Sequence, residues 1–421
     1  AISPEGQRSQ VASGTFLVGY QPTDFVNVPI VSLMVGPDDF FDYDTGIYTL
    51  GAGYDDWLDA WYEENDEDFE DWQVQGNYSN RGREWERPVT VTFIDGGEGF
   101  TQDMGVRIKG GVSRSYNQRS LRLIAREDYG KKSVKYPIFV NNQRLDGTGE
   151  VSKYKMFVLR NGGNDTDCRI KDAALQEIVH RSGLDVDGQS TQPVVHFING
   201  EYISMLNMRE PNNKHFAYAN YGIDTDEMDQ FEMSPDSGYV QMEGDREAFL
   251  KWYDLSANAA DEATYEEIRH LVDIDEYINY MAVEFYLGGN DWPQNNIKGF
   301  RPRTEDGRFR FVMFDLDGTL ATTSPFYTFE GKQNYTFDYI YDLGGQLTEE
   351  IELVTIFLNM LENESFRKQF IDTYCLVAGS VFEPERCNAI IDEMAARMHK
   401  AIAIIQFKVE GQRILNHPEY H

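Results

Sequence analysis

The sequence predicts an α+β protein in which mixed and antiparallel sheets are followed by a helical C-terminal part. Segments rich in β-branched and aromatic residues, separated by turn residues, dominate the first half of the chain. Helical periodicity dominates at 245–288 and again after about residue 348. The chain has 421 residues, 41% of them hydrophobic, so it is long enough for a large core and two or three lobes.

Five segments before residue 161 have the composition of strands. They are rich in β-branched and aromatic residues, and in several of them apolar and polar residues alternate. The predicted strands are 28–36, 88–94, 106–109, 120–125 and 156–160. A hairpin at 194–198 and 202–208 follows, because Asn199-Gly200 suits a type I′ turn, in which both central residues need a positive φ.

A first helix is predicted at 170–179, with Asp167 as its N-cap and Gly183 just beyond its end. A second, at 273–287, begins with the capping-box spacing of Asp273 and Glu276. We expect its apolar stripe to be part of the core; the stripe is Ile274, Ile278, Met281 and Phe285.

A second hairpin is predicted at 296–301 and 308–314, with its turn near Asp306-Gly307. It follows the helix at 273–287 after a Gly-Gly pair and the segment 290–296.

The formal net charge is −33, which disfavours binding to nucleic acid or to anionic membrane surfaces. Between 55 and 71 there are ten acidic residues and no basic one, interleaved with Trp57, Trp61, Tyr62 and Phe69. This segment indicates a solvated acidic helix or loop with aromatic anchors. The alternative is a surface that binds cations or a basic partner.

No apolar run is long enough for a transmembrane helix. The cysteines and histidines lack the spacing of a zinc site, so no structural zinc is expected. The start Ala1-Ile2-Ser3-Pro4 is typical of a trimmed or mature chain.

The chemistry is concentrated in two segments. Asp291 and Asn296 have the Asp-x4-Asn spacing of a protein-kinase catalytic loop, where the Asp accepts the proton of the attacking hydroxyl and the Asn holds Mg²⁺. About twenty residues later an apolar strand ends at Asp315, followed by Asp317-Gly318, as a kinase delivers its metal-binding Asp. Together they predict an acidic, metal-dependent phosphate site. The alternative is that these side chains only satisfy turn and strand-end amides.

The segment 311–320 (FVMFDLDGTL) also looks like the first motif of haloacid-dehalogenase phosphatases. In that alternative Asp315 is a nucleophile and Asp317 a general acid. A series of βα units would have to follow, but the residues after 320 are few and mostly helical in pattern. The phosphatase alternative is therefore the weaker one.

Several short segments occur in a fixed order: 105–113 (GVRIKGGVS), 118–123 (QRSLRL), 159–165 (LRNGGND) with Arg169 and Asp172, 197–200 (FING) with Arg209-Glu210, 290–296 (NDWPQNN) and 314–319 (FDLDGT). In this order they resemble the spore-coat protein H (CotH) family of atypical, secreted-kinase-like proteins. The resemblance spans about 105 to 320, and its specificity lies in the number and order of the pieces.

The resemblance implies an atypical, two-lobed kinase-like fold that transfers a phosphoryl group from ATP to a protein hydroxyl, with Mg²⁺ or Mn²⁺. It implies that Asp291 is the catalytic residue. It also implies metal binding by Asp315, with Asn296 and Asp317 as further ligands.

On the nucleotide side, Arg119 stands where the family usually has a Lys expected to touch the phosphates. Arg binds with a planar fork and is not equivalent to a point-charged ammonium. Lys109 and Glu210 are further candidates for nucleotide binding, and Lys109 or Lys155 could take the place of the missing Lys. A catalytically silent relative that binds nucleotide, metal or a partner therefore remains an alternative.

Arg160 and Arg169 either bind phosphate or pair structurally with Asp165 and Asp172, and the structural role is favoured. The predicted domains are a β-rich extension at 1–100, a kinase core at 101–345 and a helical part at 346–421. From the resemblance we expect an exported protein with an unidentified protein substrate. An exported adhesion or recognition protein that uses its acidic segment is a third alternative.

Overall fold

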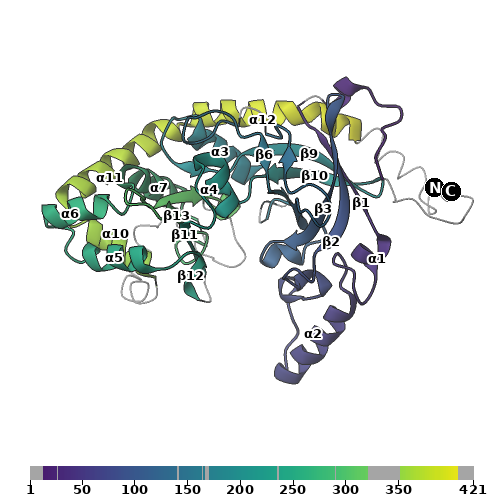
Figure 1. Cartoon of the computed structure of the whole chain (residues 1–421), viewed down its shortest axis with the longest axis horizontal. Helices are drawn as coiled ribbons and strands as arrows, with labels where there is room; N and C mark the ends of the chain where they lie inside the picture. Colours follow the sequence, from purple (N-terminus) through teal and green to yellow (C-terminus); the bar gives the residue numbers. More distant parts are fainter. Residues whose placement is uncertain are drawn as a thin grey trace, which may run out of the picture.

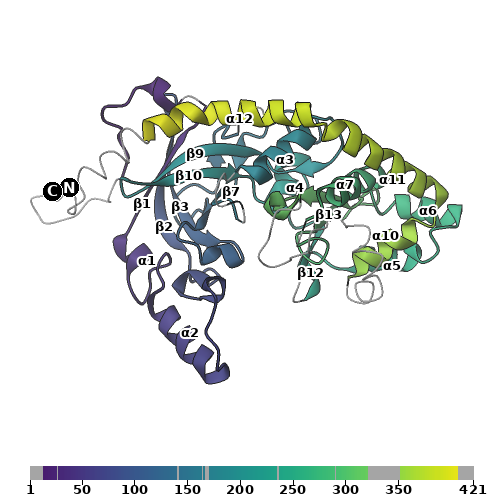
Figure 2. The ribbon, with the colours of Figure 1, turned by 180° about the vertical axis from the view of Figure 1, so that it is seen from behind.

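A computed structural model describes residues 13–25, 27–139, 142–163, 165, 170–234, 237–289, 291–320 and 351–405. Figure 1 shows a β-barrel beside a second sheet with its helices, and α12 (Pro384–Ile405) runs along both parts. Figure 2 shows the same arrangement from behind. The mixed α+β class predicted from the sequence is confirmed.

Seven strands close the barrel in the order β1-β2-β3-β4-β7-β10-β9. Neighbours are antiparallel except β1 and β9, which pair in parallel and close it. The strands are β1 (Ile30–Val35), β2 (Arg87–Asp95), β3 (Glu98–Lys109), β4 (Ser120–Ile124), β7 (Met156–Arg160), β9 (Thr191–Ile198) and β10 (Glu201–Arg209). Each predicted strand of this half coincides with one of these or with part of one.

The turn between β9 and β10 confirms the predicted hairpin. Asn199 and Gly200 have φ values of 50° and 85°, so both central residues have the positive φ that a type I′ turn needs. The Asn199 side chain also accepts a hydrogen bond from Val35 N (2.9 Å), which ties the turn to β1.

The two faces of the barrel strands differ in chemistry, because successive side chains point to opposite sides. Leu121, Leu123 and Leu159 are fully buried inside the barrel. Arg122 and Arg160 alternate with them and therefore lie on the outer face. This outer face bears the basic residues of the candidate site.

The second sheet has the order β12-β11-β13-β14-β8, antiparallel except for the β14–β8 pair. Its strands are β8 (Asp187–Gly188), β11 (Met228–Ser234), β12 (Gly238–Glu243), β13 (Lys298–Pro302) and β14 (Arg310–Met313), and β5 (Val134–Lys135) pairs separately with β6 (Lys153–Tyr154). The β13–β14 pair confirms the predicted second hairpin.

The helices are α1 (Pro37–Phe41), α2 (Gly51–Glu64), α3 (Lys171–His180), α4 (Lys214–Tyr221), α5 (Glu247–Ser256), α6 (Glu262–Arg269), α7 (Ile274–Leu287), α10 (Glu352–Met360), α11 (Glu364–Leu376) and α12, with a π-helical turn at Val377–Val381. The described part after residue 350 is helical, as predicted. The predicted N-cap Asp167 lies outside the described residues, as does Arg169.

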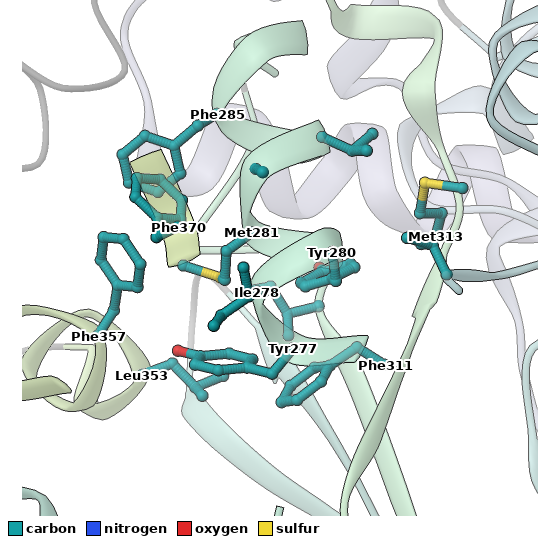
Figure 3. Close-up of a cluster of buried hydrophobic side chains, with 14 of the residues drawn as sticks. Tyr277, Ile278, Tyr280, Met281, Phe285, Phe311, Met313, Leu353, Phe357 and Phe370 are labelled. Carbon is teal, nitrogen blue, oxygen red and sulfur yellow. The ribbon is translucent and has the colours of Figure 1, made fainter. Parts of the chain in front are cut away.

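Helix α7 forms the centre of the larger core. Figure 3 shows Ile278, Met281 and Phe285 of the predicted stripe packed toward Phe357 of α10 and Phe370 of α11. The stripe is therefore core, as predicted. This packing fixes the helix whose C-terminal end leads into the segment around Asp291.

The capping box predicted at the start of α7 is wrong, although the helix itself is correct. Asp273 occupies the N-cap position without a side-chain capping bond, because its carboxylate accepts from Arg310 Nη1 (2.9 Å). Glu276 is fully buried and accepts from Phe311 N (3.1 Å). Both acids therefore bind β14, and they join the helix to the strand that carries Asp315.

The acidic segment at 55–71 includes most of α2, which projects from the barrel in Figure 1. Its aromatic residues pack on one another, with the rings of Trp57 and Phe69 4.8 Å apart. We call residues 51–73 the acidic arm. The domain boundary at residue 100 remains a prediction. The strands β1 and β2, which precede it, belong to the same barrel as later strands.

Within the described residues, no helix is both long and apolar enough to cross a membrane.

Candidate active site

Asp291 lies in the turn after α7. The helix ends at Leu287, and Gly288 follows as its C-cap with a left-handed φ of 59°. Trp292 is 3% exposed, and its Nε1 donates to the Tyr280 hydroxyl (3.2 Å). Asn295 N donates to Asp291 O (3.0 Å), and Asn296 follows with φ 58°. A buried tryptophan therefore anchors the turn that presents Asp291.

Asp315 and Asp317 lie where β14 ends. Asp315 has a left-handed φ of 63°, which Asp tolerates better than most residues and which is enriched at functional sites. The short 3₁₀ turn Leu316–Gly318 follows. Thr319 Oγ1 donates to Leu316 O (2.7 Å), and Lys171 Nζ donates to Thr319 O (2.5 Å). The turn is thus held both internally and by α3.

Arg160, the last residue of β7, bridges the two carboxylates. Its Nη2 donates to Asp317 Oδ1 (2.6 Å) and makes a shorter contact with Asp315 Oδ1. Its Nη1 lies 3.8 Å from Asp172 Oδ2 on α3. The sequence favoured a structural pairing of Arg160 and Arg169 with Asp165 and Asp172. For Arg160, the structure shows Asp172 nearby and closer contacts with Asp315 and Asp317.

Asp172 joins four elements of the site. It is 3% exposed and bonds to Arg209 of β10 as well as facing Arg160. Its Oδ1 accepts from Leu316 N (3.0 Å), in the turn after Asp315. The cations beside it hold the pKa of Asp172 below its usual range although burial opposes this. Asp172 therefore positions the acidic turn against the barrel.

The carboxylates of the site are electrostatic neighbours. Burial raises the pKa of Asp315, Arg160 opposes this, and the nearby Asp317 adds to it, so that the pKa lies at about 7. Burial and the charge of Asp317 raise the pKa of Asp291. The structure thus brings together Asp291, Asp315 and Asp317, which the sequence predicted as one site.

Lys109 lies at the same place, at the end of β3. Burial first, and then the cations Arg122 and Lys298, lower the pKa of Lys109 to about 7, while Asp315 and Glu232 oppose the shift. The outer face of the barrel therefore places Lys109 opposite the second sheet and within electrostatic reach of Asp315. By contrast, the charges that act on Lys155 are Arg126, Glu127, Glu86 and Lys132.

Arg119 faces the N-terminal part of the chain. Its guanidinium stacks on the rings of Tyr78 (4.2 Å) and Tyr48 (5.1 Å), and its Nε has no hydrogen-bond partner among the described residues. Its nearest charged or titratable neighbours are these two tyrosines. The described contacts do not bring Arg119 to the three carboxylates, and its predicted phosphate role stays a prediction.

Glu210 is 1% exposed at the end of β10. Its carboxylate accepts from Ser190 N (3.1 Å) and Asn220 Nδ2 (3.4 Å), and burial raises its pKa. These bonds tie β10 to the start of β9 and to α4. Its predicted nucleotide role also stays a prediction.

The donor set can be tested against a divalent cation. The described residues contain no group of three His, Cys, Asp or Glu that could hold a metal ion. Mg²⁺, however, commonly takes only one or two carboxylates and completes its octahedron with phosphates and water. In this structure the guanidinium of Arg160 bridges one oxygen of Asp315 and one of Asp317. These two carboxylates fit a metal that arrives with a nucleotide.

Comparisons with known proteins give one long match and two short ones. The chain is 51% identical over 43 residues to a class 3 fructose-1,6-bisphosphatase of Clostridium tetani, covering 9% of this chain and 6% of that protein. It is 44% identical over 55 residues to the same enzyme of Clostridium novyi, covering 10% and 8%. The chain thus spans less than a tenth of these relatives, so the activity in their names is said of those proteins alone.

The long match covers the site. The model of the CotH kinase protein family matches residues 106–405, which include Lys109, Arg160, Asp291 and Asp315. Because this is well over half of the chain, the protein belongs to the CotH kinase family.

Proposed function

We propose that this protein transfers a phosphoryl group from ATP to a hydroxyl of a protein substrate. The observation that carries the proposal is the convergence of Asp291, Asp315 and Asp317 beside Arg160. Phosphoryl transfer needs little covalent help but much charge neutralisation and positioning. An acidic cluster faced by Arg160 and Lys109 supplies groups for both.

Asp291 accepts the proton of the attacking hydroxyl. Burial and the charge of Asp317 raise its pKa, which makes it a stronger base than a free aspartate. It lies after α7 on a turn that Trp292 anchors. Asn296 follows in the same turn and is proposed as a further metal ligand.

Asp315 and Asp317 would hold Mg²⁺ or Mn²⁺, which would supply charge neutralisation for the phosphate oxygens. Arg160 then binds the nucleotide phosphates while Asp172 keeps its guanidinium in place. Protein kinases use a strand Lys and a helix Glu for this purpose, and here β7 and α3 supply an Arg and an Asp. Lys109 is the second cation on the phosphate side.

The test is transfer of label from ATP to the protein itself and to casein, with Mn²⁺ or Mg²⁺. Replacing Asp291 by Asn lowers the rate by about 10²–10⁴-fold while leaving nucleotide affinity within a few-fold, because only the base is lost. Asp315→Asn removes both metal-dependent binding and transfer. Equal transfer by the wild type and both variants would exclude this site.

A second candidate function is nucleotide binding without transfer, which the position of Arg119 between Tyr48 and Tyr78 favours. In that case ATP with Mn²⁺ raises the melting temperature, but no label is transferred. Arg119→Gln and Arg160→Gln, which remove the same charge, identify the phosphate-binding arginine. We expect nucleotide affinity to fall with Arg160→Gln alone.

The protein is proposed to act outside the cytoplasm, on the ground of its family alone. Cell fractionation with an antibody against the protein tests this. The phosphatase alternative is tested by release of phosphate from p-nitrophenyl phosphate, which we expect to be absent.

A further inference from the structure

A cavity of about 210 Å³ lies between the β5–β6 hairpin and α4. Its walls also include the start of β7 and the chain that follows β10. Its lining residues are Lys132, Ser133, Lys153, Tyr154, Lys155, Met156, Glu210, Pro211, His215, Tyr218, Ala219 and Thr225. None of the proposed catalytic or metal-binding carboxylates is among them.

The lining of this cavity is positive in a protein whose net charge is −33. Three lysines line it, against one acid, Glu210. The carboxylate of Glu210 is already bonded to Ser190 and Asn220, and burial raises its pKa, which favours its neutral form. Glu210 therefore does little to neutralise the lysines.

Two of the three lysines lack an acidic partner among the described residues. Among the described residues, Lys153 and Lys155 form no ion pair. Lys155 Nζ donates to Lys132 O (3.3 Å), and Lys153 Nζ lies over the Tyr218 ring (5.8 Å). Lys132 faces Glu127 at 3.8 Å, but both side chains are more than 70% exposed, so this pair is weak.

The pKa of His215, another lining residue, is lowered in part by the positive charges around the cavity. Burial lowers its pKa to about 4, and the nearby charges of Lys214, Lys155 and Arg126 all act in that direction. Lys214 is the first residue of α4, and it pairs with Glu243 (3.0 Å). A concave site with unpaired lysines is a place where an anion can replace water favourably.

We propose that this cavity binds a phosphate ester. Lysine ammonium groups bind phosphate as point charges, and Lys153 and Lys155 are the unpaired ones. Ser133 and Thr225 add hydroxyl donors to the lining. Met156, Pro211 and the ring of Tyr218 provide an apolar wall for the organic part of the ester.

The cavity is distinct from the acidic site, although one strand connects them. Met156 and Arg160 are the two ends of β7, four residues or ~13 Å apart. A ligand in the cavity therefore lies beside the strand that positions Arg160 without occupying the place between Asp315 and Asp317. The proposal holds whether or not the protein transfers phosphoryl groups.

The experiment measures binding by titration calorimetry in EDTA, so that metal-dependent binding at Asp315 and Asp317 does not contribute. The probes are a phosphoserine peptide, its unphosphorylated form, AMP and inorganic phosphate. The test variant is Lys153→Gln/Lys155→Gln. The matched control is Lys131→Gln/Lys135→Gln, which removes the same charge from exposed residues of the same hairpin region that do not line the cavity.

We expect at least one ester to bind saturably, and the test variant to weaken it by at least about tenfold while the control changes it less than about twofold. The ester that binds more tightly identifies the source, a phosphorylated protein or a small phosphorylated molecule. The proposal is overturned if neither ester saturates below about 1 mM. It is also overturned if the control loses as much affinity as the test variant, or if the unphosphorylated peptide binds equally well.

Discussion

The acidic site and the acidic arm are both rich in carboxylates, but they differ in what surrounds them. In the site, Asp172 and Asp317 are nearly buried and face Arg160, and Asp172 also binds Arg209. In the arm, the acids at 55–71 are exposed, and none of them forms an ion pair among the described residues. The count of acids is higher in the arm, yet the site has the convergent geometry that chemistry needs.

The comparison teaches that net charge does not locate function in this protein. Charges that converge in a buried place must be balanced by partners, because an isolated buried charge is costly. The arm avoids this cost by leaving its carboxylates in water. Substitutions in the two regions should therefore differ strongly in their effect on stability.

The largest effect is expected from Asp172→Asn. This change leaves the buried guanidinium of Arg209 without its carboxylate and weakens the hold on Arg160. Breaking a buried ion pair from one side costs about 3–5 kcal/mol of unfolding free energy. Denaturant unfolding measures it, and Asp59→Asn in the arm is the control, expected within about 0.5 kcal/mol. Similar losses from both variants would refute the contrast between the two regions.

His196 gives a third case, burial without a partner. It is 1% exposed on β9, and neither ring nitrogen has a hydrogen-bond partner among the described residues. Burial lowers its pKa to about 3, below the value of about 6.5 expected in the unfolded chain. Between these values the unfolded state binds the proton and the native state does not, so stability falls as the pH falls.

The loss is up to about 1.4 kcal/mol for each pH unit below about 6.5. We expect His196→Leu to have a smaller decrease in unfolding free energy than the wild type between pH 7 and pH 4.5. Urea unfolding at the two pH values measures it. Parallel decreases in both proteins would show that His196 does not contribute to the acid sensitivity.

A smaller effect is expected from Mg²⁺ added in the presence of a fixed concentration of ATP. A ligand that binds only the native state at ten times its Kd stabilises by about 1.4 kcal/mol. We expect a rise in melting temperature with Mg²⁺ that EDTA reverses. Asp315→Asn/Asp317→Asn abolishes the rise, whereas Asp56→Asn/Asp59→Asn in the arm leaves it unchanged. A rise that survives in the first variant would place metal binding elsewhere.

The sequence predicted those parts of the fold and of the candidate site that depend on neighbouring residues. They are the strands, the Asn199-Gly200 turn and the spacing of Asp291, Asn296 and Asp315. The structure has the strands and the turn where they were predicted. The barrel closure could not be predicted, because β1 meets β9 across about 165 residues with no local signal. Closure is decided by packing of the whole barrel interior.

The same limit applies to the partners of the site. Arg160 and Asp315 are 155 residues apart, and Asp172 contacts Leu316 across 144 residues. The motif that contains Arg160 was recognised, but its contact with Asp315 depends on how β7 and β14 approach. The capping box failed for the same reason, since β14 offers Asp273 and Glu276 better partners than the helix start does.

The smallest effect is expected from neutralising the arm itself. Replacing Asp56, Asp59, Glu63, Glu64 and Asp66 by the corresponding amides removes exposed charges that form no ion pair within the part of the chain that the structure describes. Less like-charge repulsion should raise the unfolding free energy slightly, by less than about 0.5 kcal/mol, and the gain should vanish in 1 M salt because exposed charges are screened. Denaturant unfolding at low and high salt measures it. A large loss of stability at both salt concentrations would mean that the arm carboxylates have structural partners, and the contrast with Asp172 would fail.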